Sequence, residues 1–509
     1  MREAVGTHRA IVTIAAMLGM FLAAIDQTAV GTAMPSITQA LGGLGFYSWV
    51  FAAYQLAFVT TTPVFGRLAD VYGRKLTYLT GILWFIGASV LCGFSRTMGE
   101  LVGFRLLQGI GGGAVLPIAF TIVADLYPVT ERLRIQGIFS GVFGFASIVG
   151  PLVGGFLTDH FTWRWIFFLN VPAGIVATAI VMIGFANAGP RRSGGIDYAG
   201  IILLAAASVT LLLLLLWGGQ AFPWGSSRAA GLLMLCAVLV YLFVFVERRA
   251  PNPFLPLGVF RTRLISIGSV GSFLLSASMF GAIVYIPLAV QGVFGQTATV
   301  AGATLVPFSV CWTLGSILGG WWSLRWGYRP VITGGMILMV TGFALLSRPM
   351  PEAALKSIVL AMVVLGTGMG LTTSMFMIAM QNAVSSEYRG IVTSVNIFSR
   401  NIGSAIGVSL QGAVLIAVLT RQLELHGAAR SVELVRGLDP RGALDAGVAG
   451  LGPTGQGVFR QALAQAIHSS FLMDFALVAF GLVLVLLLVP SGSVLDLAQP
   501  EMPRRVERE

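Results

Sequence analysis

The stretch GRLADVYGRK occupies residues 66–75, and a second stretch, GWWSLRWGYR, occupies residues 320–329. Each begins with a glycine, has another glycine seven residues later, ends in a basic residue and follows a long apolar run. The two stretches lie 254 residues apart in a chain of 509 residues. A loop motif that recurs after half the chain predicts two similar structural halves.

The composition is that of an integral membrane protein. Hydrophobic residues make up 56% of the chain and charged residues 10%, and the mean hydropathy is +0.88. Charged residues make up roughly 25% of soluble domains. This composition excludes a soluble enzyme and a soluble nucleic-acid-binding protein.

The apolar runs are predicted to be helices. Lipid offers no partner to backbone polar groups, and the runs are too long and too continuously apolar for barrel strands. The predicted fold class is therefore all-α. We expect fourteen transmembrane helices, at residues 11–34, 47–66, 76–94, 100–123, 135–158, 165–186, 198–217, 229–247, 264–290, 300–320, 330–347, 355–378, 391–418 and 468–489.

The basic residues predict the orientation of these helices. If the N-terminus is cytoplasmic, the inner joints and both tails contain nineteen Arg and Lys residues, and the short outer joints contain five. Because Arg and Lys accumulate in cytoplasmic loops, both termini are expected to be cytoplasmic. This asymmetry also explains the net charge of +11, so no nucleic-acid partner is expected.

Cysteine and histidine give no sign of a disulfide framework or a metal site. Cys92, Cys236 and Cys311 all fall in apolar runs without CxxC spacing, and the four histidines show no ligand spacing. We expect no metal and no cofactor.

The repeat and the helix count together predict the domain organisation. Two six-helix units account for twelve helices, and the pair at 198–217 and 229–247 lies between them without a repeat motif. We expect an N-terminal six-helix bundle, an inserted helix pair with its linker, a C-terminal six-helix bundle and a cytoplasmic tail. Their respective residues are 1–190, 191–260, 261–490 and 491–509, and residues 421–466 form an extracellular loop, either a small hairpin or a mobile cover.

Several motifs accompany the stretch at 66–75. The first span contains Asp26 to Val30 followed by Pro35, RLLQG occupies residues 105–109, residues 144–155 are rich in glycine, and WRWIFFLNVP occupies residues 163–172. Together these motifs resemble the signatures of the major facilitator superfamily, and specifically of its fourteen-helix drug:proton antiporter branch of multidrug exporters. Gly31 departs from that branch, which usually has asparagine there, so the polarity of the cavity near Asp26 is expected to differ.

The resemblance implies a secondary active transporter and not an enzyme. It implies export of amphiphilic small molecules, including antibiotics, in exchange for protons. Two bundles would rock about a central cavity between spans 11–34, 100–123, 264–290 and 355–378. The expected setting is a bacterial cytoplasmic membrane, with the chain as a monomer in the lipid bilayer. Export of a lipid, a peptide or a siderophore is the alternative, and a membrane scaffold or enzyme is a remote one.

Asp26 is the strongest candidate for chemistry. It is the only carboxylate deep inside the first thirteen spans, where a buried charge is costly and usually functional. Asp26 lies about 13 Å and Arg105 about 10 Å from the outer ends of their spans, at 1.5 Å per residue, so Arg105 is its expected partner. The two can serve as a proton carrier and its counter-charge, or only as a packing contact. One acid and one arginine at this depth suit binding and proton exchange better than bond making.

The other candidate residues fall into three groups. We expect Tyr54, Gln108, Phe280, Tyr285, Phe308 and Gln381 to line the cavity. The family resemblance implies that Gly66, Asp70, Gly73, Arg74 and Lys75 form a cytoplasmic gate, in which Asp70 binds a helix N-terminus and inner-loop arginines such as Arg132, Arg134 or Arg389; a solvated topology loop is the alternative. Leu324 replaces Asp70 in the second copy, which predicts a weaker gate contact there.

Gly150, Pro151, Gly154 and Gly155 form the expected antiporter packing motif. Asp474 is expected to be structural.

Overall fold

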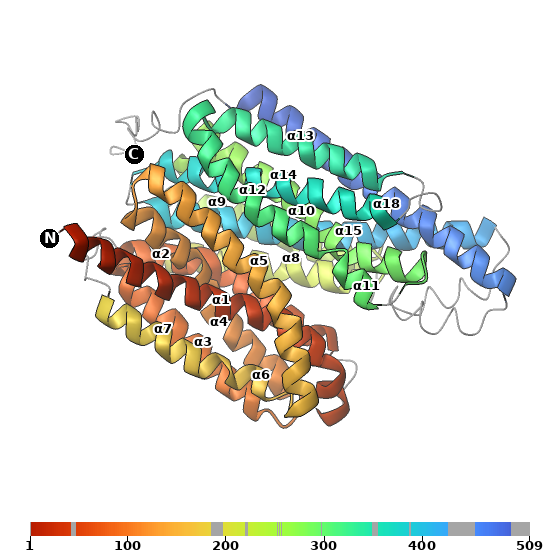
Figure 1. The fold of residues 1–509 in the computed structure, drawn as a ribbon, viewed down its shortest axis with the longest axis horizontal. Helices are drawn as coiled ribbons and strands as arrows, with labels where there is room; N and C mark the ends of the chain where they lie inside the picture. Colours follow the sequence, from red (N-terminus) through yellow and green to blue (C-terminus); the bar gives the residue numbers. More distant parts are fainter. Residues whose placement is uncertain are drawn as a thin grey trace.

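The structure, a computed structural model, is all-helical. It describes residues 2–41, 47–184, 197–218, 222–251, 253, 255, 257–296, 298–348, 355–385, 388–425 and 453–489. Helices α1 to α7 gather on one side of the molecule and α10 to α18 on the other (Figure 1). The predicted fold class is therefore confirmed.

The N-terminal side contains five long helices and a broken one. Within it, α1 packs on α5 and α7, and α4 packs on α2 and α3. The bounds are α1 Arg2–Leu41, α2 Tyr47–Tyr72, α3 Arg74–Phe94, α4 Met98–Leu126, α5 Val129–His160, α6 Trp165–Phe168 and α7 Asn170–Gly184.

The remaining helices form an intervening pair and the C-terminal side. The pair, α8 and α9, packs together, and α8 also contacts α2 and α15, one from each side. On the C-terminal side α14 packs on α12 and α13, and α10 packs on α15 and α18. The bounds are α8 Tyr198–Trp217, α9 Ser227–Arg249, the 3₁₀ helix η2 Leu257–Arg261, α10 Arg263–Gly292, α11 Ala298–Ala303, α12 Val306–Trp326, α13 Tyr328–Leu346, α14 Leu355–Asn382, α15 Arg389–Leu425 and α18 Pro453–Leu488.

Side-chain caps fix the start of several helices. The hydroxyl of Thr97 accepts a hydrogen bond from the backbone N–H of Glu100 at 3.2 Å, and Asp197 and Ser226 do the same at the starts of α8 and α9. Such caps satisfy backbone donors that have no partner within the helix. The polar joints between apolar runs therefore also define where the helices begin.

Each predicted span overlaps helix, but some boundaries were wrong. The span at 300–320 is divided into α11 and α12, and the span at 165–186 is divided at Leu169. The last helix begins at Pro453 and not at 468, because Phe459, Leu463 and Ile467 add a buried apolar face to a segment that also contains polar residues. Residues 426–452 of the expected loop and the expected tail at 491–509 lie outside the described residues.

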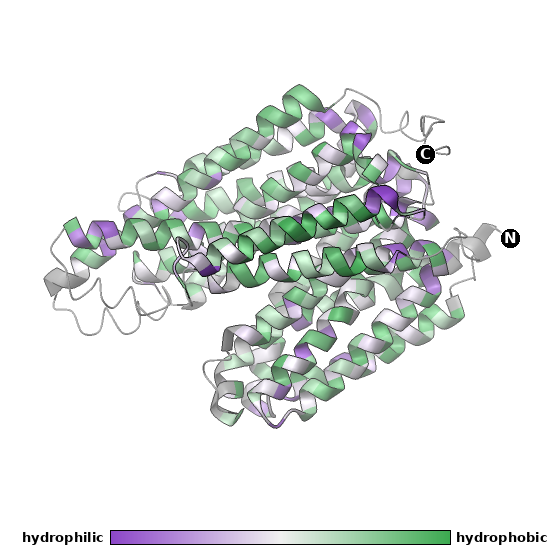
Figure 2. Cartoon of the chain, turned by 180° about the vertical axis from the view of Figure 1, so that it is seen from behind, coloured by the Kyte–Doolittle hydropathy of each residue, from purple (hydrophilic) through white to green (hydrophobic). Residues whose placement is uncertain are grey.

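The surface is suited to lipid. Among the described residues, twelve helices are long and apolar enough to cross a membrane; α2 and α5, of 26 and 32 residues, are not among them. Figure 2 shows hydrophobic residues along the helices and hydrophilic residues mainly near their ends. On α9, Met234 is 70% exposed and Tyr241 is 67% exposed. Exposed apolar surface of this extent is expected of a multi-pass membrane protein, which this chain is.

The sequence repeat is also a structural repeat. Gly73 lies between α2 and α3 with φ 92°, and Gly327 lies between α12 and α13 with φ 81°. Positive φ is readily adopted only by glycine, so both turns require this residue. The two halves thus use the same reversal at the same repeat position.

Glycines bring α4 close to α2. A Cβ added to Gly109 would lie 3.0 Å from the carbonyl carbon of Tyr54, and one added to Gly113 would lie 2.7 Å from the carbonyl oxygen of Phe58. This GxxxG pair lets two backbones approach, as is common between membrane helices. The spacing of residues 109–114 also fits a dinucleotide-binding fingerprint, but these residues lie inside α4 and Gly109 and Gly113 are packing positions.

Gly113→Ala is expected to lower the melting temperature of the purified protein. The added methyl group would overlap the backbone of α2, and overpacking of this kind costs about 1–3 kcal/mol. Gly103→Ala on the same helix is the control, because no described atom lies within 4 Å of its added Cβ. Equal melting temperatures for the two variants would contradict the close packing of α4 on α2.

Candidate functional site

Asp26 and Arg105 form a buried ion pair. Asp26, on α1, and Arg105, on α4, are each 1% exposed. Arg105 Nη1 lies 2.5 Å from Asp26 Oδ2. Burial of either charge alone would be costly, and a charge-assisted hydrogen bond offsets that cost for the pair.

Two amides complete the surroundings of the carboxylate. Gln108 Nε2 donates to Asp26 Oδ1 at 2.9 Å, and Asn170 Nδ2 donates to the same oxygen at 3.1 Å. Both amide groups also contact the hydroxyl oxygen of Ser89, which donates to the carbonyl of Phe167. Every described hydrogen-bond partner of Asp26 is a donor, as an ionised carboxylate requires. We refer to Asp26, Ser89, Arg105, Gln108 and Asn170 as the Asp26 network.

Arg105 connects this network to a cavity. Its Nε donates to the carbonyl of Val50 at 3.3 Å, and its guanidinium carbon lies 4.3 Å from the centre of the Tyr54 ring. The same arginine lines a cavity of about 560 Å³, whereas Asp26 lies behind it and is not a lining residue. Arg105 therefore contacts both the cavity and Asp26.

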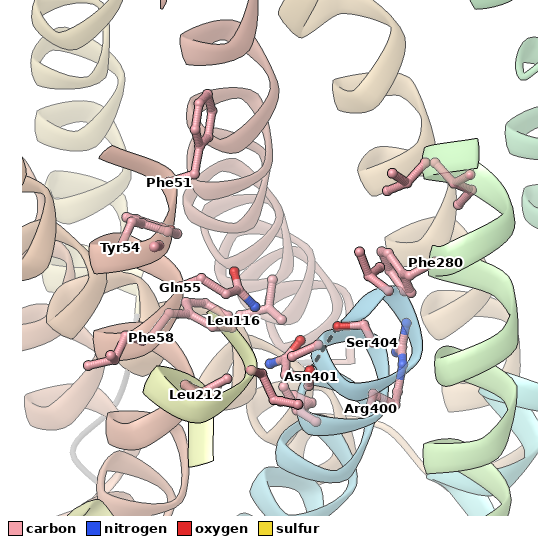
Figure 3. Close-up of a pocket in the computed structure, with 18 of the residues that line it drawn as sticks. Phe51, Tyr54, Gln55, Phe58, Leu116, Leu212, Phe280, Arg400, Asn401 and Ser404 are labelled. Atoms are coloured by element: carbon pink, nitrogen blue, oxygen red, sulfur yellow. Dashed lines mark hydrogen bonds between the residues drawn. The ribbon is translucent and has the colours of Figure 1, made fainter. Parts of the chain in front are cut away.

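The cavity lies between the two sides of the molecule. In Figure 3, Tyr54, Gln55 and Phe58 of α2 face Arg400, Asn401 and Ser404 of α15. Most of the lining is apolar, and the volume lies within the range of small-molecule sites. The residues that line it include Phe51, Tyr54, Gln55, Phe58, Arg105, Leu116, Phe120, Leu212, Leu215, Phe280, Ile283, Trp312, Thr373, Ser374, Met377, Arg400, Asn401, Ser404 and Ser409.

Only part of the expected lining is found here. Tyr54 and Phe280 line this cavity, but Gln108 belongs to the Asp26 network, and Tyr285 and Phe308 are buried in the core of the C-terminal side. Gln381 donates to Thr393 at 2.9 Å and is fully buried. The expectation was wrong for these four residues, because their side chains take part in buried contacts within one side of the molecule.

The lining helices also differ from expectation. Helices α4, α10 and α14 contribute as expected, but no described residue of α1 lines the cavity. Instead, α2, α8, α12 and α15 contribute lining residues. The span that contains Asp26 was expected to line the cavity, whereas in the structure Arg105 lines it and contacts Asp26.

Asp70 joins the two sides at one end of the molecule. Its Oδ2 accepts a hydrogen bond of 3.0 Å from the backbone N–H of Ile391, in the first turn of α15, and its Oδ1 pairs with Arg74. A carboxylate at a helix N-terminus is stabilised by unsatisfied backbone donors and the helix dipole. Arg74 also donates to Asp125 at 3.2 Å, so the contact extends to the end of α4.

Further contacts close the same end. Arg132 of α5 donates to Asn382 of α14 at 2.7 Å, and Arg389 lies 3.6 Å from Asp125. A Cβ added to Gly66 would lie 2.6 Å from the Cβ of Ser394 on α15, so this glycine permits close approach of α2 and α15. We refer to this region, formed by Gly66, Asp70, Arg74, Asp125, Arg132, Asn382, Arg389 and Ile391, as the closed end.

Two residues of the loop motifs take no part in these contacts. Lys75 Nζ donates to the carbonyl of Met182 at the end of α7, so its expected place in the gate is wrong in this conformation. Its side chain neutralises a helix C-terminus instead. Leu324, at the Asp70 position of the second copy, is 40% exposed and cannot form an equivalent ion pair.

The glycine motif of α5 divides in two. A Cβ added to Gly150 would lie 3.3 Å from the carbonyl oxygen of Ile25 on α1, so Gly150 is a close-contact position. Gly154 is buried, but no described atom lies within 4 Å of a Cβ added to Gly155, which is therefore not a tight packing position. The side chain of Pro151 lies outside what the structure describes.

Asp474 is buried in the C-terminal side. It accepts a hydrogen bond from Gln411 Nε2, which also donates to the carbonyl of Ser278, so the contact joins α18, α15 and α10. No described basic residue forms an ion pair with it. It does not line the cavity described above, which fits the structural role expected for it.

Sequence interpretation missed several polar residues of these sites. Ser89 and Asn170 lie inside apolar runs, and Arg400 lies inside the span expected at 391–418. Asn170 could have been predicted as a site residue, because it belongs to the motif at residues 163–172. Asn382 gave no signal, since nothing in its spacing points to Arg132.

Comparison with known proteins agrees with this architecture. The model of the Major Facilitator Superfamily matches residues 16–408. The multidrug transporter protein MdtP of Bacillus subtilis is 36% identical over 418 residues, covering 82% of this chain and 77% of that protein. Multidrug resistance protein 3 of the same organism is 35% identical over 412 residues, covering 81% and 80%.

A solved structure shows the same fold at low identity. The proton:xylose symporter XylE is 11% identical, with a TM-score of 0.62, and the match covers 97% of this chain and 100% of that one. The family match spans most of the chain, including the Asp26 network and the closed end. The chain therefore belongs to the major facilitator superfamily of membrane transporters.

Proposed function

We propose that this protein exports amphiphilic small molecules across the cytoplasmic membrane in exchange for protons, by alternating access. The observation that carries the proposal is the buried Asp26–Arg105 pair, in which Asp26 is removed from the cavity and Arg105 lines it. The similarity to two proteins named for multidrug transport and resistance supports the substrate class.

Protonation of Asp26 would require the network to rearrange. Arg105 and the two amide nitrogens can only donate hydrogen bonds to the carboxylate. A proton on Oδ1 would face the two amide donors, and a proton on either oxygen would remove the charge that attracts Arg105. Arg105 would then be released toward the cavity, so proton binding and substrate binding are coupled through one side chain.

The closed end supplies the second part of the mechanism. Besides the close approach of Gly66 to α15, its contacts between the two sides include a few ion pairs and hydrogen bonds at Asp70, Arg132 and Arg389. Contacts of this kind can break without exposing a large apolar surface, so the two sides can separate there and close at the other end. We assign the closed end to the cytoplasmic side, in keeping with the basic residues found in that set of loops.

The full membrane arrangement follows from the same proposal. With α2 and α5 added to the twelve apolar helices, the chain crosses the membrane fourteen times and both termini are cytoplasmic. One chain contains both sides of the cavity, so a monomer is the proposed transport unit.

The proton gradient would supply the free energy for export. At −100 mV the entry of one proton releases about 2.3 kcal/mol, and each pH unit adds about 1.4 kcal/mol. Together these terms support a concentration ratio of up to several hundred.

Export of a lipid, a peptide or a siderophore is the alternative within transport. A cavity of about 560 Å³ with a mostly apolar lining suits a compact amphiphile better than a long chain or a polar chelate.

Asp26→Asn is expected to abolish uphill transport while leaving the protein folded, because the isostere keeps the shape of the carboxylate and loses its proton. The measurement is accumulation of a fluorescent amphiphile in proteoliposomes with an imposed pH gradient. Glu131→Gln, which removes an exposed acid on α5, is the control and should behave as the wild type. Accumulation above equilibrium by the Asp26→Asn protein would exclude Asp26 as the proton carrier.

Asp70→Asn is expected to raise the population that is open at the closed end, because the substitution removes the ion pair with Arg74 and weakens the contact with α15. A reporter cysteine at Ser394, which is fully buried beside Gly66, should then be labelled several-fold faster in a cysteine-free background. Lys75→Gln is the matched control and should leave labelling unchanged. Equal labelling for Asp70→Asn and the parent would mean that the motif does not hold this end closed.

Dicationic amphiphiles are expected to be poor substrates. No described acidic residue lines the cavity, and Asp26 is already paired with Arg105, so a second cationic group would be buried without a partner. The measurement is uptake of matched monocationic and dicationic dyes into inverted vesicles under a pH gradient. Comparable rates for the two dyes would show that the cavity contains a negative site outside the described residues.

A further inference from the structure

Arg400 is a second arginine in the cavity wall. It lies on α15, on the C-terminal side, whereas Arg105 lies on α4. Arg105 and Arg400 are the only charged residues among the described lining residues. The charge of the lining is therefore positive, and only Arg105 has a carboxylate in contact with it.

Arg400 has few partners in the protein. Its guanidinium carbon lies 5.9 Å from the centre of the Trp312 ring, at the outer limit of a cation–π contact. Its buried Nε has no hydrogen-bond acceptor, and no described acidic residue forms an ion pair with it. An arginine held in a largely apolar cavity without a counter-charge leaves a strong donor group available to a ligand.

Asn401, the next residue, also has a buried donor without an acceptor. Asn401 Nδ2 is buried without an acceptor, and the residue lines the cavity beside Arg400 (Figure 3). The hydroxyl of Ser404 donates to the carbonyl of Asn401, and neither Arg400 Nε nor Asn401 Nδ2 donates to this hydroxyl. Buried polar groups are rarely left unsatisfied, and two adjacent donors call for an acceptor from outside the protein.

We propose that Arg400, assisted by Asn401, binds the carboxylate of an amphiphilic substrate. The planar guanidinium matches a carboxylate in a two-pronged hydrogen-bonding geometry. The aromatic residues of the cavity, among them Phe58, Phe280 and Trp312, would hold the apolar body of the same ligand. This inference rests on the proposed export function and narrows its substrate class to amphiphiles that bear one carboxylate.

The site is separate from the proton-carrying group. No described contact joins Arg400 to the Asp26 network, whose members lie on α1, α3, α4 and α7. A carboxylate at Arg400 therefore leaves Asp26 and its donors in place. Binding of the ligand and proton transfer can consequently be measured independently.

The test is equilibrium binding of dansyl-phenylalanine and of its methyl ester to the purified protein, followed by dansyl fluorescence without a pH gradient. The two probes share their apolar body and differ in the carboxylate. We expect the wild type to bind the acid at least about tenfold more tightly than the ester, as is usual for a hydrogen bond between charged groups. Arg400→Gln should reduce this ratio to about one, and Arg400→Lys should retain part of it.

Two controls make the outcome decisive. Arg421→Gln removes an exposed arginine from the same helix and should keep the wild-type ratio. Affinity for the ester should change little in Arg400→Gln, which shows that the cavity is intact. A wild type without preference for the acid, or an Arg400→Gln protein with an undiminished preference, would overturn the proposal.

The result is distinguishable from a failure of the export function. Acid preference through Arg400 together with an absence of uphill transport would contradict proton-coupled export and leave the carboxylate site standing. Uphill transport without acid preference would contradict the carboxylate site and leave proton-coupled export standing.

Discussion

A charge buried among apolar helices must find a partner inside the protein, and this constraint shapes the N-terminal side of the molecule. Asp26 obtains an arginine from α4 and amide donors from α4 and α7, and Ser89 of α3 joins the two amides. One carboxylate therefore fixes the relative positions of four helices. Under the proposed function, the contacts that hold these helices together would also change with the protonation state of Asp26, so structural stability and transport would share one set of hydrogen bonds.

Glycine contacts occur both within the two sides and between them. Within the sides, Gly113 of α4 packs on α2, and Gly407 of α15 packs on α10. Between the sides, Gly66 of α2 packs on α15, and Gly137 of α5 packs on α12. At the closed end, polar contacts at Asp70 and Arg132 accompany the glycine contacts between the sides. Under the proposed exchange, the closed end would have to release both kinds of contact, whereas the contacts within each side would be kept.

Sequence reasoning identified the features that depend on spacing and failed on those that depend on which side chains meet in space. Depth along two spans placed Asp26 opposite Arg105, and the repeated glycines located both positive-φ turns. Tyr285 and Phe308 were expected in the cavity and lie in the core. A hydropathy window does not show which apolar side chains meet the other half and which pack within their own half. The roles expected for Gly155 and Lys75 were wrong for a related reason. A motif shows which residues occur together in the sequence, and it does not show which of them make contacts. Arg400 was overlooked because basic residues were counted in the joints, where they report topology, and not within the span at 391–418.

The charge of the cavity also bears on the energy available for export. If one proton enters for each substrate that leaves, export of a monocation moves no net charge across the membrane, and export of a neutral or zwitterionic substrate moves one charge. A departing monoanion raises it to two, and each charge contributes about 2.3 kcal/mol per 100 mV. A cavity wall with two arginines, only one of them paired with a carboxylate, favours the ligands whose export the membrane potential assists most. If both proposals hold, selectivity and driving force act in the same direction.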